Sequence, residues 1–367
     1  MGKSATPAPD YVFLGLVGAL VLFGVIALAS ASSVISFEKF GSSFYLVRHQ
    51  LLSGILPGII LCLIALRISY NTWKRITPWL LLGTLFLLLL VLIPGIGVKL
   101  GGSRSWFSLG PISFQPSELA KFSFLLYLAA WCESKGMMLR DLKRGFIPFL
   151  GLAASVALLI VLQPDVGTLC IIGASVLLLG FAAGARLPHL GSAILVGILL
   201  LALLVKIAPY RGARLTAFIH PELDPQGVGY HINQALLAVG SGGMFGVGFG
   251  NSRQKFRYLP EVTGDSIFPI IAEEMGFLVT AGLIVLIVAI IWRMFSIASR
   301  APDAFSRYAI IGFASWFGVQ ALVNIGAMLG VMPLTGLPLP FVSYGGTALA
   351  VELLAVGVVG SISKHAK

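Results

Sequence analysis

One stretch of the chain places basic and acidic side chains directly ahead of a long apolar run. Three cations are followed by two carboxylates: Arg253, Lys255, Arg257, Glu261 and Asp265. A carboxylate at the mouth of a membrane helix is costly to place, and beside cations it suggests chemistry on an anionic substrate. Asp265 is therefore a candidate general base. Asp also favours helix N-caps and first turns, and this structural role is open and compatible with the chemical one.

Two further pairs of charged residues lie inside apolar runs. Glu118 and Lys121 are three residues apart, so on a helix they share one face and can form an ion pair. The alternative is a cavity wall, in which Lys121 meets a phosphate or the catalytic acid. Glu273 and Glu274 lie about two turns beyond Asp265 and must face protein or water at that depth. We expect Glu273 to extend a polar cavity and Glu274 to pair across helices.

Other candidates for substrate binding lie in the connections between apolar runs. Arg104, beside Trp106 and Phe107, suits either a pyrophosphate or an interfacial anchor. Asp165 either caps the following helix or faces the site. The remaining candidates are polar side chains in or near the same connections: Gln115, Arg211, Arg214, Lys255, Arg257 and Ser343.

The segment 240–250 is too rich in glycine for a regular helix. Its backbone N–H groups can approach a phosphate, as in anion nests, or the segment can pack as an irregular loop on other loops. The five histidines are dispersed, and the three cysteines lie in or beside apolar runs, so neither set has metal-site spacing. A divalent cation, Mg or Mn, is a candidate companion of a pyrophosphate, with no ligands assigned.

Composition defines the elements that must position these residues. The 367 residues are 57% hydrophobic and 11% charged, against about 25% charged in soluble domains, so the chain is an integral membrane protein. Apolar runs of membrane-spanning length predict an all-α polytopic fold. We expect ten transmembrane helices, at about 11–33, 47–68, 76–95, 117–133, 145–163, 167–185, 189–208, 267–292, 306–328 and 341–362.

Basic residues in alternate short loops predict the orientation. The loops with the basic excess belong on the cytoplasmic side, and both termini lie there. Residues 1–367 then form a single membrane domain with a large extracytoplasmic loop between the seventh and eighth helices. The outer loops that carry the candidate site are 96–116, 209–266 and 329–340.

With these residues in view, the chain resembles the SEDS family (shape, elongation, division and sporulation) of cell-wall enzymes nearly end to end. The resemblance rests on several long motifs in the same order: Gly110-Pro-Ile-Ser-Phe-Gln-Pro-Ser-Glu-Leu-Ala-Lys121, Gln163-Pro-Asp-Val-Gly-Thr168, Tyr258-Leu-Pro-Glu261, Glu273-Glu-Met-Gly276 and Pro340-Phe-Val-Ser-Tyr-Gly-Gly346.

This resemblance implies a peptidoglycan glycosyltransferase of the bacterial cytoplasmic (inner) membrane. Its substrate is lipid II, a disaccharide-pentapeptide on undecaprenyl pyrophosphate, and its partners are a class B penicillin-binding protein and other divisome or elongasome proteins, with no nucleic acid. By resemblance, Asp265 falls on the catalytic aspartate, and Arg104, Glu118 and Lys121 fall on outer-cavity positions. FtsW-like division enzymes are favoured over RodA-like elongation enzymes. One departure is that Gly264 and Ser266 flank Asp265, where relatives usually have Thr and an aromatic residue.

Two other functions are compatible with the composition. A lipid II flippase would need a hydrophilic path across the whole bilayer, whereas the candidate residues cluster on the outer side. A membrane scaffold of the division machinery would explain the inner loops but not the outer charges.

Overall fold

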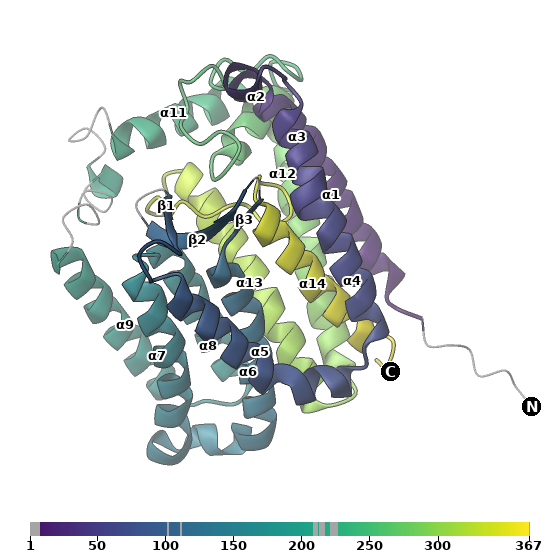
Figure 1. The fold of residues 1–367 in the computed structure, drawn as a ribbon, viewed down its shortest axis with the longest axis vertical. Helices are drawn as coiled ribbons and strands as arrows, with labels where there is room; N and C mark the ends of the chain where they lie inside the picture. Colours follow the sequence, from purple (N-terminus) through teal and green to yellow (C-terminus); the bar gives the residue numbers. More distant parts are fainter. Residues whose placement is uncertain are drawn as a thin grey trace, which may run out of the picture.

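The structure of the protein is a computed structural model that describes residues 8–100, 103–110, 112–207, 212, 217–220 and 227–366. A helix stands at each of the ten predicted transmembrane positions, so the polytopic helical fold is confirmed (Figure 1). These helices are α1 (Tyr11–Ala31), α3–η1–α4 (Tyr45–Gln50, Leu51–Ile55 and Leu56–Arg67), α5 (Tyr70–Leu90), α6 (Pro116–Lys135), η3–α7 (Leu142–Phe146 and Ile147–Leu162), α8 (Val166–Ala182), α9 (Leu187–Ile207), α12 (Ile267–Ser299), α13 (Ala304–Met328) and α14 (Gly346–Ser363).

Eight of the described helices are long and apolar enough to cross a membrane. Of the other two predicted spans, α8 is a shorter apolar helix of 17 residues, and α6 is charged. Burial separates the helices into an inner and an outer group. Of their most apolar segments, 83% is buried in α14 and 67% in α13, against 6% in α9. The centre of the bundle is therefore built from α13 and α14, together with the largely buried α6.

Local sequence explains where several helices begin. Asp10, Asp165 and Asp303 each accept a hydrogen bond from a backbone N–H in the first turn of α1, α8 and α13, and so satisfy a donor that the helix leaves unpaired. The last helix begins at Gly346 rather than at residue 341 as predicted. Phe341 to Gly345 form a non-helical loop just before it.

One end of the bundle carries additional structure that the sequence analysis did not predict. A three-stranded antiparallel sheet of β1 (Val98–Leu100), β2 (Ser103–Leu109) and β3 (Ile112–Phe114) covers the ends of the central helices (Figure 1). The Thr347 hydroxyl at the start of α14 donates to the Ser113 carbonyl at 3.0 Å and fastens β3 to the bundle. The short helices α2 (Ser33–Phe40) and α11 (Val228–Ser241) lie at this same end. We call it the sheet end.

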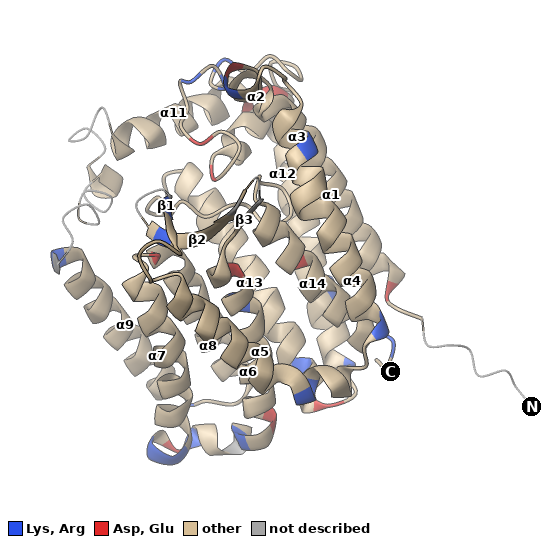
Figure 2. Ribbon diagram, in the orientation of Figure 1, with Lys and Arg blue, Asp and Glu red and all other residues tan. Residues whose placement is uncertain are grey.

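The opposite end holds both ends of the described chain. The Ser363 hydroxyl of α14 accepts a hydrogen bond from the Asp10 backbone N–H at 2.9 Å, and Asp10 pairs with Arg293 of α12 at 2.7 Å. Figure 2 shows Lys and Arg gathered in the connections at this end. The predicted location of both termini on one side of the bundle is confirmed.

A kink in α12 brings a loop into close contact with the helix. Gly276 has φ = 74°, a conformation that L side chains rarely adopt, and a Cβ there would lie 2.2 Å from the Gly246 backbone nitrogen. Phe277 N–H then donates to the Gly243 carbonyl at 2.9 Å. The glycine-rich segment is thus held against α12 by backbone hydrogen bonds, which only two facing glycines allow.

Gly276→Ala should therefore destabilise the protein. The added Cβ meets backbone rather than a movable side chain, so we expect a loss of about 2–4 kcal/mol and a melting temperature in detergent lower by about 5 °C or more. Gly282→Ala in the same helix is the matched control, because beyond the adjoining backbone of α12 no atom of the described residues lies within 4 Å of its Cβ position. Equal melting temperatures for the two variants would contradict the close-contact explanation.

Candidate functional site

Asp265 lies at the sheet end, immediately before α12. It is half-buried, and the N-cap position of α12 is taken by Ser266 rather than by Asp265. Its Oδ1 accepts a hydrogen bond from Ser266 Oγ at 3.3 Å. Its Oδ2 lies beside Gly336, where a Cβ would come within 3.9 Å of it. The predicted general base therefore faces the loop between α13 and α14.

Two amide side chains of α13 hold that loop in place. Asn324 Nδ2 donates both to the Asp265 backbone carbonyl at 2.8 Å and to the Leu337 carbonyl at 2.7 Å. One turn away, Gln320 Nε2 donates to the Pro338 carbonyl at 2.9 Å. Asp265 and the loop 336–338 thus share one support, which we call the α13 clamp (Asn324 and Gln320).

A second connection joins the loop to the turn before Asp265. Tyr344 N–H donates to the Thr263 carbonyl at 2.8 Å, and the Tyr344 hydroxyl lies 2.8 Å from His49 Nδ1. Burial, with a smaller contribution from Tyr45, raises the pKa of the Tyr344 phenol, so this hydroxyl keeps its proton. Ser343 shapes the loop from within, because its Oγ accepts from Leu339 N–H at 2.8 Å.

The predicted Glu118–Lys121 pair is present and fully enclosed. Lys121 Nζ lies 2.9 Å from Glu118 Oε2, and the two side chains are 0% and 3% exposed. Lys121 also donates to Gln320 Oε1 at 2.8 Å and lies 5.0 Å from the centre of the Trp316 ring. The pair therefore connects to Asp265 through the α13 clamp and the loop 336–338. Its role in substrate binding stays a prediction.

A second buried carboxylate lies near this pair. Glu352 of α14 is 2% exposed and accepts a hydrogen bond from Phe341 N–H at 2.8 Å. Sequence reasoning did not single out Glu352, although an acid in the middle of an apolar run was a usable signal.

Asp165 has the capping role that was one of its two interpretations. Its carboxylate accepts from Thr168 N–H at 3.0 Å, Thr168 Oγ1 at 2.9 Å, Ser117 Oγ at 3.3 Å and Gln115 Nε2 at 3.4 Å. It therefore joins the starts of α6 and α8. A contact of Asp165 or Gln115 with substrate stays a prediction.

Arg104 lies on β2 and is half-buried. Its Nη1 donates to the Leu92 carbonyl at 3.4 Å, and its Nε has no hydrogen-bond partner among the described residues. Because this Nε is buried, a contact of Arg104 with an anion stays a prediction. Arg257 is exposed and pairs with Glu38 of α2 at 2.7 Å. Arg211 and Arg214 lie outside the described residues.

Lys255 is held inside the protein and does not contact Asp265 through any described hydrogen bond or ion pair. Its ammonium is 2.9 Å from Glu274 and 3.2 Å from Ser30 Oγ of α1. Glu274 also accepts from Ser30 Oγ at 2.7 Å, which confirms its predicted pairing across helices. These contacts tie the glycine-rich loop to α1 and α12, and a contact of Lys255 with substrate stays a prediction.

Glu273 is used by the same loop. It accepts from Ser252 Oγ and from Arg253 N–H, the latter at 3.0 Å. The backbone N–H groups of Val247 and Gly248 donate to the carbonyls of Glu273 and Glu274 at 2.9 and 3.0 Å. Of the two interpretations of the glycine-rich segment, the packed loop is the one present, and Glu273 is enclosed by it.

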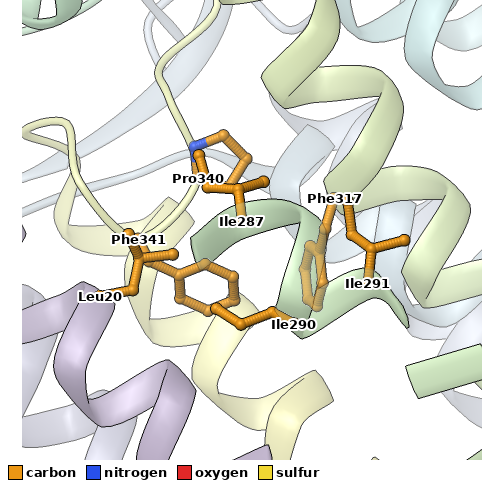
Figure 3. A pocket seen from close by; sticks show the side chains of 7 residues that line it. All are labelled: Leu20, Ile287, Ile290, Ile291, Phe317, Pro340 and Phe341. Atoms are coloured by element: carbon orange, nitrogen blue, oxygen red, sulfur yellow. The ribbon is translucent and has the colours of Figure 1, made fainter. Parts of the chain in front are cut away.

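A small apolar recess lies between α1, α12, α13 and the loop before α14 (Figure 3). Its lining is apolar: Leu20, Ile287, Ile290, Ile291, Phe317, Pro340 and Phe341. Such a lining offers nothing to a sugar or a phosphate.

The described residues hold no group of three His, Cys, Asp or Glu side chains arranged to bind a metal ion. A magnesium ion commonly keeps several waters and binds through one or two carboxylates plus substrate phosphates. The divalent cation therefore stays a prediction, and no step below is assigned to it.

The fold and the site define a polytopic membrane protein with its buried charges at one end. The family model of the cell cycle proteins FtsW, RodA and SpoVE matches residues 11–367, and the chain belongs to this family. This confirms the resemblance to the SEDS family.

Named relatives and solved structures match over nearly the whole chain. Stage V sporulation protein E of Bacillus subtilis is 40% identical, over 98% of both chains. A probable peptidoglycan glycosyltransferase FtsW of Trichlorobacter lovleyi is 38% identical, over 98% of this chain and 94% of that one. The rod shape determining protein RodA of Thermus thermophilus has 31% identity and a TM-score of 0.72, over 97% of both chains. A chain of a peptidoglycan synthase complex that coordinates polymerization and crosslinking has 31% identity and a TM-score of 0.80, over 97% of this chain and 98% of that one.

Lys121→Met should strongly destabilise the protein, because it leaves Glu118 buried without its cation. We expect a cost of about 3–5 kcal/mol in thermal unfolding, largely recovered in the double variant Glu118→Gln/Lys121→Met. Lys74→Met is the control, because the Lys74–Glu133 pair is partly exposed and such pairs contribute about 1 kcal/mol or less. Equal losses in the two single variants would show that Lys121 is not needed to neutralise buried charge.

Proposed function

We propose that this protein is a peptidoglycan glycosyltransferase that polymerises lipid II at the outer face of the bacterial cytoplasmic membrane. Family membership and relatives named as glycosyltransferases support the reaction. Identities of 40% and 38% to sporulation and division proteins favour the FtsW-like branch over the RodA-like one.

One observation supports this function above the others. Every charged residue that is buried in the described chain lies in the loop before α12 or within about the first two turns of a helix that starts at the sheet end: Glu118, Lys121, Lys255, Glu273, Glu274 and Glu352. Buried charge is therefore concentrated at the sheet end of the bundle. A flippase needs polar groups along a path through both halves of the membrane, and a scaffold needs no buried charge at all.

The chemistry follows from the position of Asp265. The 4-hydroxyl of an acceptor sugar attacks the anomeric carbon of a donor that carries the pyrophosphate, and its proton must leave as the bond forms. Oδ2 of Asp265 takes that proton, while Oδ1 is held by Ser266. The α13 clamp fixes the backbone of Asp265 and limits the motion of the carboxylate during the reaction.

The leaving pyrophosphate requires positive charge. We assign this role to Arg104, which lies on β2 at the sheet end and pairs with no carboxylate among the described residues. Arg211, Arg214 and Arg257 are further candidates on the same side. Lys121 and Lys255 act indirectly, because each neutralises a buried carboxylate that supports the site.

A class B penicillin-binding protein is the proposed partner, as the transpeptidase that crosslinks the new strands. The support is the similarity to a chain of a peptidoglycan synthase complex. Both chain ends then lie in the cytoplasm, in agreement with the basic connections at that end.

Asp265→Asn should abolish polymerisation while leaving a folded protein. The amide keeps the size of the side chain but cannot accept the proton, so we expect a loss of at least about 10²-fold in glycan formation. The measurement is strand formation from lipid II by the purified protein in detergent, with and without divalent cation, alone and with its class B partner. Retained polymerisation would remove Asp265 as the base.

Wild-type protein that forms no strands under any of these conditions would contradict the proposed reaction. Lipid II translocation in liposomes would then test the transporter. Arg257→Gln is a useful comparison with Arg104→Gln. Arg257 is exposed and already paired with Glu38, so we expect its replacement to reduce strand formation less than the replacement of Arg104.

A further inference from the structure

A chain of three polar side chains ends at the carboxylate of Asp265. His231 Nε2 of α11 lies 2.6 Å from Ser266 Oγ, and Ser266 Oγ lies 3.3 Å from Asp265 Oδ1. Ser266 is 0% exposed, and His231 and Asp265 are half-buried. The three residues come from a helix in the outer loop and from the turn before α12, so tertiary structure brings them together.

The side chain of Ser266 does not cap the helix that it precedes. Ser266 occupies the N-cap of α12, where a serine oxygen usually accepts a hydrogen bond from the first turn, but within the described chain its side chain makes no such bond. The oxygen is used by His231 and Asp265 instead. The buried Ser266 hydroxyl bonds to His231 and Asp265 instead of capping α12, which indicates a role at the candidate site.

The direction of the two hydrogen bonds follows from the number of hydrogens. Ser266 has one hydroxyl hydrogen, and an ionised carboxylate only accepts. The hydroxyl therefore donates to Asp265 Oδ1 and must accept from His231, so His231 carries its hydrogen on Nε2. This arrangement holds Oδ1, while Oδ2 lies on the side of Gly336, in the loop between α13 and α14.

We propose that His231 and Ser266 are positioning residues for Asp265: His231 fixes the Ser266 hydroxyl so that it donates to Oδ1 and presents Oδ2 to the acceptor sugar. The inference rests on the proposed role of Asp265 as base. It assigns a function to the departure that Ser266 represents within the family, and to a histidine that the sequence analysis left unassigned.

The arrangement predicts that the effect of His231 on kcat passes through Ser266. Ser266→Ala removes the hydrogen bond to a charged acceptor, so kcat should fall about tenfold or more with KM for lipid II unchanged. His231→Leu should lower kcat by a smaller factor, because the hydroxyl remains but turns freely. His231→Gln should restore most of kcat, since its amide can donate to Ser266 in the same way. The double variant Ser266→Ala/His231→Leu should be no slower than Ser266→Ala alone.

The experiment measures kcat and KM for lipid II polymerisation with the full-length protein, alongside melting temperatures. Ser241→Ala on α11 is the matched control, because its hydroxyl bonds only to the Ala238 carbonyl of its own helix among the described residues. Multiplying losses in the double variant, or an impaired His231→Gln, would show two independent structural effects and overturn the inference.

Asp265→Asn in the same assay separates this inference from the proposed function. If Asp265→Asn polymerises lipid II, Asp265 is not the general base, and the positioning roles of His231 and Ser266 are rejected as well. If Asp265→Asn is inactive while Ser266→Ala keeps the wild-type kcat, only the positioning pair is wrong.

Discussion

The α13 clamp is the contact on which the site depends. Asn324 and Gln320 lie one turn apart on a helix whose most apolar segment is 67% buried, and each donates to a carbonyl of the loop 336–338. Asn324 also holds the backbone of Asp265, and Gln320 accepts from Lys121. In a low-dielectric interior an unpaired amide is costly, so these side chains tolerate few other arrangements. The rigid centre of the bundle thereby sets the geometry of a site made largely from loops.

A second set of buried charges supports the other side of the site. Lys255 and Glu274 fasten the glycine-rich loop to α1 and α12, and the kink at Gly276 makes room for that loop. The loop continues directly into the turn that carries Asp265. Buried charge here organises the backbone around Asp265. Two of the three cations that shortly precede Asp265 are already paired, Lys255 with Glu274 inside the protein and Arg257 with Glu38 at the surface.

Much of the fold followed from the sequence, because apolar runs of spanning length have few alternatives in a membrane. The Glu118–Lys121 pair followed from charge placed where it is costly, and the role of Asp265, predicted in the same way, stays a prediction. The sheet did not follow, since two of its strands have only three residues each and lie among glycines and serines. The pairing of Lys255 with Glu274 was not predicted either. It depends on the loop folding back on α12, and no local pattern encodes that tertiary contact.

Glu352 has a consequence for how the protein is assembled in the membrane. Glu118 enters the bilayer with a cation three residues away on its own helix, so α6 carries a compensated pair from the start. The apolar stretch of α14 contains no Lys or Arg, and the described hydrogen bond to Glu352 comes from the Phe341 N–H, in the loop just before that helix. The last span therefore carries a buried acid that is satisfied by its own preceding loop, so α14 and that loop must fold together.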